Sequence, residues 1–176
     1  TQGGYYLASV ADKVIVNPVG SLSWHGLASE TMFLKDFLAK IGVKMQIFRV
    51  GTYKSAVEPM TNTEMSPANR EQTQAFLESM WKNIVDDVAA SRNISVDSLN
   101  SLADRNMDLR PAEEYVRCGL ADTLMYKDEV LSYLKSLARL TEEDNLHTLS
   151  LDEMTRVKSA TPKSKTRDVI AVYYAY

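Results

Sequence analysis

Apolar and polar residues along this chain form two kinds of pattern, short runs of β-branched residues and longer stretches with helical spacing. Apolar side chains that recur every three or four residues predict helices, whereas short β-branched runs predict strands. The clearest helix starts at Ser66-Pro67, a capping residue followed by proline at the first helical position, and runs to about Ser91. Its predicted buried stripe consists of Phe76, Leu77, Met80, Trp81, Ile84, Val85 and Val88.

Shorter helices and several strands are predicted on both sides of this helix. Ser29 and Ser95 are potential N-caps, and Pro111 is a helix start. The alternation of short strands with helices favours an α/β fold with parallel pairing. The shorter helices are predicted over residues 5–11, 29–41, 95–102, 111–118 and 127–140, with a helical turn at 151–157, and the strands over residues 13–17, 43–50, 120–125 and 168–176, of which 43–50 is expected to be buried.

The same patterns divide the chain into three parts. Residues 1–140 carry nearly all of the periodic segments and form the predicted domain, while residues 141–167 are polar and weakly patterned, as in a linker. Residues 168–176 form a β-rich run that stops in mid-pattern, and the chain begins without methionine. We therefore interpret the sequence as a fragment of a longer protein.

Composition and charge exclude several classes of function. The 176 residues carry a net charge of −3 and no basic run, which argues against a nucleic-acid partner. The two histidines, His25 and His147, lack the ligand spacing of a metal site, and the single cysteine, Cys118, cannot form an internal disulfide. No phosphate-binding glycine motif is present, and no apolar run approaches the ~20 residues that span a bilayer.

Lys54 is the candidate catalytic residue. It lies in a loop directly after the predicted strand 43–50, where α/β folds place functional groups, and its neighbours Val50, Tyr53 and Val57 are apolar. Burial of a lysine favours its neutral form, which can act as a general base. A nearby Glu58 carboxylate would oppose this effect by stabilising the ammonium form. From these residues alone, an ordinary loop lysine that reaches water is the simpler interpretation.

Four segments resemble a known family. Residues 51–59 (Gly-Thr-Tyr-Lys-Ser-Ala-Val-Glu-Pro), followed by Met-Ser-Pro at 65–67, are similar to the lysine-bearing loop in the amino-terminal half of long-form signal peptide peptidase A (protease IV). Residues 1–18 resemble the family's segment around and after the nucleophile, and residues 29–37 resemble its next helix. Gly-Leu-Ala-Asp at 119–122 is similar to a turn of the wider crotonase/Clp-protease fold.

The resemblance implies a fold of stacked short strands with surrounding helices and a Ser/Lys dyad with Lys54 as the general base. Gln2 occupies the position of the nucleophilic serine, so the resemblance implies that the serine lies outside this chain. It further implies cleavage of residual signal peptides at the bacterial cytoplasmic membrane, with the catalytic part facing the periplasm. The resemblance also implies a homo-oligomer, with a tetramer expected, and membrane attachment through a segment outside this chain. It implies no cofactor or metal.

Two alternatives to the protease remain open at this level. An acyl-CoA hydratase or isomerase of the same fold would use paired glutamates and an oxyanion loop, and it gives Lys54 no role. A non-catalytic assembly module is compatible with Gln2 in place of the serine. Apart from these alternatives, Trp24 in the turn-rich segment 20–27 is a candidate exposed aromatic for contact with a neighbouring subunit.

Overall fold

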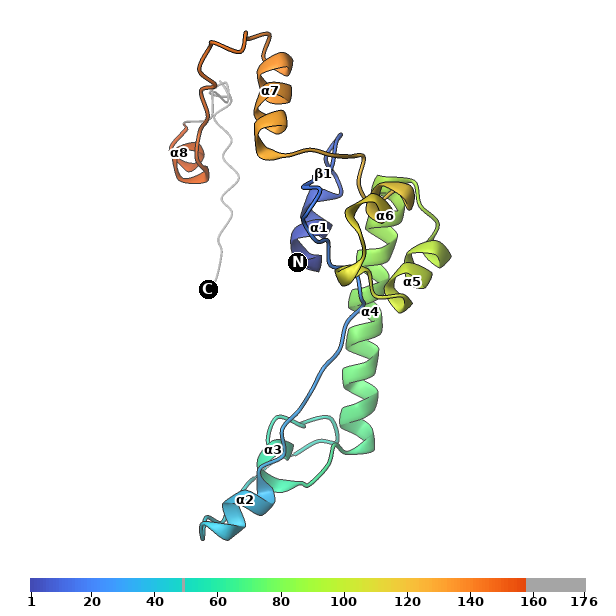
Figure 1. The fold of residues 1–176 in the computed structure, drawn as a ribbon. Coiled ribbons are helices and arrows are strands. Elements are labelled where there is room, and N and C mark those ends of the chain that lie inside the picture. Colours follow the sequence, from blue (N-terminus) through green and yellow to red (C-terminus); the bar gives the residue numbers. More distant parts are fainter. Residues whose placement is uncertain (49, 158–176) are drawn as a thin grey trace, which may run out of the picture. The chain divides into compact units, whose positions relative to one another are not determined.

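The computed structural model describes residues 1–48 and 50–157 of the chain, with the side chain of Leu151 excepted. They fall into two units, Thr1–Val130 and a second that begins at Leu131, and each is described by itself (Figure 1). The elements follow in the order α1 (Gln2–Ala8), β1 (Ile15–Val16), α2 (Lys35–Lys40), α3 (Glu58–Thr61), α4 (Pro67–Arg92), α5 (Val96–Asp104), the 3₁₀ turn η1 (Met107–Leu109), α6 (Ala112–Arg117), β2 (Thr123–Leu124), α7 (Lys127–Leu137) and α8 (Leu151–Thr155).

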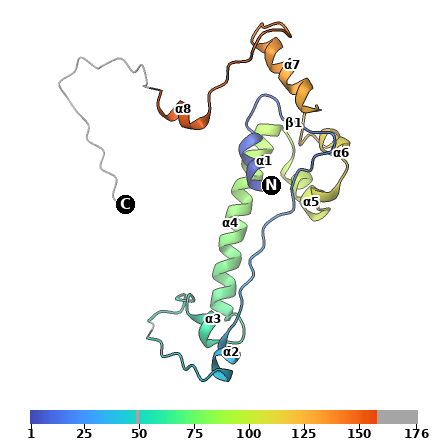
Figure 2. The same ribbon diagram turned by 60° about the vertical axis from the view of Figure 1, so that its left-hand side comes forward.

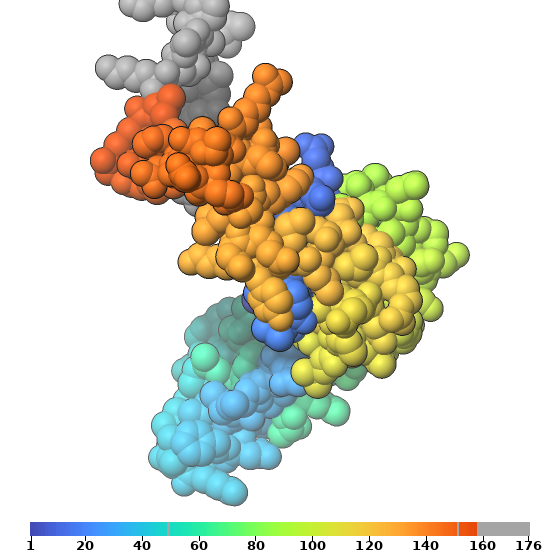
Figure 3. Space-filling view, turned by 45° about the horizontal axis from the view of Figure 1, so that its top comes forward, coloured from blue at the N-terminus to red at the C-terminus, as the bar shows by residue number. Residues whose placement is uncertain are grey.

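The two short strands of the first unit pair in parallel, as predicted. Ile15 lies opposite Thr123, and Val16 lies opposite Leu124. In the space-filling view, blue residues from the start of the chain lie against the yellow residues that follow α5 (Figure 3). Two parallel strands among many helices are compatible with the α/β class.

The hydrophobic core lies where α1, α5 and α6 meet the C-terminal half of α4 (Figure 2). Its centre is Trp24, which is fully buried and donates a hydrogen bond from Nε1 to the carbonyl of Leu99 at 2.8 Å. The Trp24 ring packs edge-on against Tyr5, with ring centroids 5.7 Å apart, and obliquely against Trp81, at 5.1 Å. The prediction that Trp24 is exposed for a subunit contact is therefore wrong.

Helix α4 begins as the sequence predicts. The Ser66 hydroxyl oxygen accepts a hydrogen bond from the backbone N–H of Asn69, and Pro67 occupies the first turn. Only the C-terminal half of the predicted stripe is in the core, since Val85 and Val88 are buried whereas Phe76 is 63% exposed. The N-terminal half of α4 is therefore left to line a different feature, described below.

Two local predictions upstream of α4 are wrong. Residues 43–48 form no strand, and Phe48 and Val50 are 89% and 86% exposed, because no described segment pairs with them. Ser29 does not cap a helix either. Helix α2 starts only at Lys35, after Leu34, which makes no side-chain cap.

The second unit begins within α7, at Leu131. The predicted inward face of α7 is exposed at Leu131, Leu134 and Leu137. The predicted helical turn is present as α8 and begins with a capping box, in which the Ser150 hydroxyl oxygen accepts from the Glu153 amide and the Glu153 carboxylate accepts from the Ser150 amide. The predicted strand 168–176 lies outside the described residues. Among the described helices, none is both long and apolar enough to cross a membrane.

Candidate active site

The loop that carries Lys54 leads from Gly51 to the start of α3. Gly51 has φ = 109°, a left-handed conformation that a residue with a Cβ rarely adopts, so a glycine is required at this turn. The Tyr53 hydroxyl donates a hydrogen bond to the Glu71 carboxylate on α4 at 3.3 Å. The Lys54 side chain is exposed, so its apolar neighbours in sequence do not bury it in this chain.

Glu58 connects the lysine loop to α4. Its side chain is only 1% exposed, which is rare for a carboxylate. One carboxylate oxygen accepts from the Ser66 hydroxyl at 2.6 Å, and the other accepts from the Ser66 amide at 3.2 Å and from the Asn69 side chain at 3.0 Å. A negative charge at this position also complements the partial positive charge of the α4 N-terminus. Glu58 is thus a buried anchor and not merely a charged neighbour of Lys54.

Two backbone hydrogen bonds hold the same loop in place. The Glu58 amide donates to the carbonyl of Ser55 at 2.9 Å, which closes a turn directly after Lys54. The Leu34 amide donates to the carbonyl of Pro59 at 2.6 Å. The lysine loop is therefore fixed both to the start of α4 and to the segment that precedes α2.

Gln2 has a structural role at the position where the resemblance places a serine. Its side-chain oxygen accepts from the amides of His25 at 2.9 Å and Gly26 at 3.2 Å, and its side-chain nitrogen donates to the carbonyl of Gly26 at 3.1 Å. All three bonds bind one turn, in which Gly26 has φ = 83°. The side chain of Gln2 therefore stabilises the turn at His25 and Gly26, after which the chain leaves the core and runs along the N-terminal half of α4.

The Gly-Leu-Ala-Asp turn at residues 119–122 holds the two strands together. Arg92 donates to the carbonyl of Gly119 at 3.2 Å and to the Asp122 carboxylate at 2.8 Å, and the Val14 amide donates to the same carboxylate at 2.7 Å. The hydrogen bond from Arg92 is the main reason why the pKa of Asp122 is lowered, and the bond from Val14 adds to it. These contacts indicate a structural role for the turn.

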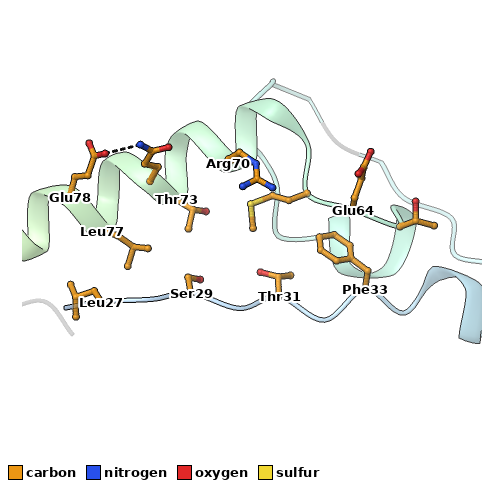
Figure 4. Close-up of a pocket in the computed structure, with 12 residues that line it drawn as sticks. Leu27, Ser29, Thr31, Phe33, Glu64, Arg70, Thr73, Leu77 and Glu78 are labelled. Atoms are coloured by element: carbon orange, nitrogen blue, oxygen red, sulfur yellow. Dashed lines mark hydrogen bonds between the residues drawn. The ribbon is translucent and has the colours of Figure 1, made fainter. Parts of the chain in front are cut away.

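A groove of about 600 Å³ runs between an extended segment and the N-terminal half of α4 (Figure 4). Side chains at every second position of the extended segment, namely Leu27, Ser29, Thr31 and Phe33, point towards the α4 residues on the other side. The rest of the lining consists of Thr63, Glu64, Met65, Arg70, Thr73, Gln74, Leu77 and Glu78. Because residues 63–65 follow α3 directly, the groove lies beside the element that anchors the lysine loop.

The structure does not bring Lys54 and Gln2 together. The lysine loop and α3 lie at the N-terminal end of α4, whereas α1, which begins at Gln2, lies beside its C-terminal half (Figures 1 and 2). Among the described residues, no three histidine, cysteine, aspartate or glutamate side chains cluster as a metal site would require.

Sequence comparisons identify the family. The model of peptidase family S49 matches residues 1–141. The chain belongs to peptidase family S49. This assignment agrees with the resemblance to signal peptide peptidase A carried by the lysine loop and its flanking segments.

Bacterial and plant proteins are among the curated relatives of this chain. The chain is 46% identical over 99 residues to "Protease 4" of Haemophilus influenzae, which covers 56% of this chain and 16% of that protein. It is 26% identical over 172 residues to "Serine protease SPPA, chloroplastic" of Arabidopsis thaliana (97% of this chain, 25% of that protein). For the "Putative signal peptide peptidase SppA" of Enterococcus faecium, the identity is 26% over 142 residues (80% and 40%). The chain thus spans well under half the length of each of these relatives.

Proposed function

We propose that this chain supplies the general base, Lys54, to a serine endopeptidase that works with a Ser/Lys dyad. The observation that carries the proposal is the lysine loop itself. The chain belongs to peptidase family S49, and its lysine loop is fixed to α4 through the buried carboxylate of Glu58. Such anchoring is what a catalytic side chain needs, because a base acts only when its nitrogen is held within hydrogen-bond reach of the nucleophile.

In this mechanism, the neutral Lys54 amine removes the proton of a serine hydroxyl as the oxygen attacks the scissile carbonyl. The resulting ammonium then protonates the leaving amine, and backbone N–H groups stabilise the oxyanion. The serine comes from outside this chain, because the Gln2 amide at the corresponding position cannot act as a nucleophile. Contact with the part that carries the serine would bury Lys54, which is exposed here, and so favour its neutral form.

The wider proposal concerns the whole protein. Its substrates are apolar, extended peptides, in particular residual signal peptides released in the bacterial cytoplasmic membrane, and its catalytic part faces the periplasm. Residues 1–140 form the lysine-bearing half of a crotonase/Clp-type domain, and a linker begins at residue 141. The protein assembles as a homo-oligomer, with a tetramer expected.

The test is a Lys54→Ala substitution in the intact protein, with Lys44→Ala as the matched control at another exposed lysine. We expect Lys54→Ala to lower kcat/KM for an apolar peptide by at least about a thousandfold, within the range by which loss of a general base reduces catalysis. Lys44→Ala should leave kcat/KM within about twofold. Full activity of the Lys54→Ala protein would refute the role of this lysine.

A non-catalytic assembly module is the second candidate, and the three hydrogen bonds of Gln2 favour it. These bonds give Gln2 a structural role, and the resemblance places the family's nucleophile at this position. On this alternative, Lys54→Ala would leave activity intact, whereas Gln2→Ala would reduce the assembly of the intact protein, which size-exclusion chromatography measures.

A further inference from the structure

We propose that Ser66 and Asn69, the N-cap and the third residue of α4, are positioning residues for Lys54. They act through the buried carboxylate of Glu58, and the kinetic constant that they set is the turnover number kcat. The proposal rests on the proposed function in one respect, namely that Lys54 is the general base. It goes further because it assigns a share of catalysis to the first turn of α4, which lies outside the lysine loop.

Two side-chain contacts connect the lysine loop to α4. The first contact is exposed, and in it the Tyr53 hydroxyl donates to the Glu71 carboxylate at 3.3 Å. The second contact is buried. In it the Glu58 carboxylate, whose residue is 1% exposed, accepts from the Ser66 hydroxyl at 2.6 Å and from the Asn69 side-chain amide at 3.0 Å. Because water competes for the groups of an exposed contact, the buried contact contributes more to the position of the loop.

A short stretch of backbone links the buried contact to Lys54. The Glu58 amide donates to the Ser55 carbonyl at 2.9 Å, which closes a turn that begins directly after Lys54. The Asn62 amide donates to the Glu58 carbonyl at 2.8 Å, so the single turn of α3 holds Glu58 from its other side. A fixed Glu58 carboxylate therefore fixes the backbone from which the Lys54 side chain extends.

A buried carboxylate keeps its place only while hydrogen-bond donors surround it. A buried charge that loses its donors costs so much free energy that the group moves to water or takes up a proton. Removal of the Ser66 hydroxyl and the Asn69 amide takes away two donors of the Glu58 carboxylate. The carboxylate then moves towards water, the turn at Ser55 moves with it, and Lys54 is displaced. A displacement of about 1 Å at a catalytic group can cost about a hundredfold in rate.

The kinetic signature follows from the role of a general base. A base takes up the proton in the transition state, so its displacement lowers kcat and leaves KM unchanged. Among the described residues that line the 600 Å³ groove, Glu58, Ser66 and Asn69 do not occur, so their replacement removes no side chain from its wall. A smaller folded fraction would also lower the apparent kcat. The comparison therefore needs a control that loses an equivalent helix cap.

Helix α5 supplies this matched control. Ser95 is its N-cap and Ser98 its third residue, and the Ser98 amide donates to the Ser95 hydroxyl oxygen at 3.1 Å, just as the Asn69 amide donates to that of Ser66 at 3.2 Å. In the intact protein, assayed on an apolar peptide well below the Tm of each variant, Ser66→Ala/Asn69→Ala should lower kcat about a hundredfold. Ser95→Ala/Ser98→Ala should leave kcat within about twofold, and KM should stay within about twofold in both variants.

Three single variants rank the two contacts. Ser66→Ala should lower kcat about tenfold, and Ser66→Thr, which keeps the hydroxyl, should recover most of that loss. Tyr53→Phe, which removes only the exposed contact, should lower kcat less than about threefold. Equal kcat in the two double variants, or a rise in KM that accounts for the loss of kcat/KM, would overturn the proposal. A larger loss in Tyr53→Phe than in Ser66→Ala would also overturn it.

A mutant cycle with Lys54→Ala separates this proposal from the dyad itself. Residues that act through Lys54 have nothing left to position in its absence, so Ser66→Ala/Asn69→Ala should cause less than about a twofold further loss in the Lys54→Ala protein. A further loss of about a hundredfold in that background would reject the positioning role and leave the dyad standing. Full activity of the Lys54→Ala protein would reject the dyad and the positioning role together.

Discussion

Replacement of Glu58 separates the structural value of its charge from that of its hydrogen bonds. The carboxylate is buried and accepts two hydrogen bonds from Ser66 and one from Asn69. Glu58→Gln preserves the shape of the side chain. Its oxygen can still accept from the Ser66 amide and from Asn69, while its new N–H₂ group can donate to the Ser66 hydroxyl. Glu58→Ala removes every one of these acceptors and leaves a cavity.

The expected magnitudes differ accordingly. In Glu58→Gln the strengthening of the hydrogen bonds by the charge is lost and the Ser66 hydroxyl becomes an acceptor instead of a donor, which together cost about 1 kcal/mol. In Glu58→Ala the partly buried Ser66 amide lacks its acceptor, at about 1–3 kcal/mol, and the removal of the buried Glu58 side chain adds to this. We therefore expect a loss of about 3 kcal/mol. At ~1.36 kcal/mol per tenfold change, these values correspond to about fivefold and about a hundredfold in a local opening equilibrium.

Native-state hydrogen exchange measures this opening directly. The reporters are the amides of Asn69 and Arg70, which donate to Ser66 in the first turn of α4. The amide of Val88, in the buried half of α4, is the internal control and should exchange as in the unmodified chain. Equal acceleration at Asn69 by the Gln and Ala variants, or less than fivefold acceleration by Ala, would refute the role of Glu58 as a buried anchor.

Two further predictions concern the core and the strand junction. Trp24→Phe should lower the free energy of unfolding, measured with urea, by about 1–3 kcal/mol, because the buried hydrogen bond to the Leu99 carbonyl is lost. Trp81→Phe should cost less, because the Trp81 indole bonds to the half-buried Asn100, and the reverse order would contradict the core described here. Asp122→Asn should lower stability at neutral pH. Because the pKa of Asp122 is lowered in the folded state, its contribution to stability is complete above the unfolded pKa of about 3.9 and disappears as pH falls through the folded pKa. A stability difference between the two proteins that does not change with pH would count against this role of Asp122.

The sequence predicted well those features that depend on neighbours in the chain. The start of α4 at Ser66-Pro67 and that of α5 after Ser95 follow from side-chain oxygens that satisfy the first amides of each helix, a contact made within three residues. The parallel pairing of the two β-rich runs was also predicted from the alternation of elements. The residues around Lys54 carried the resemblance that agrees with peptidase family S49.

The failures involve partners that are distant in the sequence. A strand exists only when another strand pairs with it, and residues 43–48 have no such partner among the described residues, although their composition is that of a strand. A tryptophan in a turn-rich segment could not be recognised as core, because the residues that bury it, Tyr5, Trp81 and Leu99, lie up to 75 positions away.

The sequence by itself therefore determined the family, the helix starts, the parallel strand pair and Lys54 as the candidate base, because each depends on local pattern or on a continuous motif. Only the tertiary structure decided that Glu58 is a buried anchor for the lysine loop, that Gln2 binds the turn at Gly26, and that residues 27–33 form one wall of a groove. The physical reason is the same for all three. Burial and hydrogen bonding depend on which distant segments come together, and a one-dimensional pattern does not contain that information.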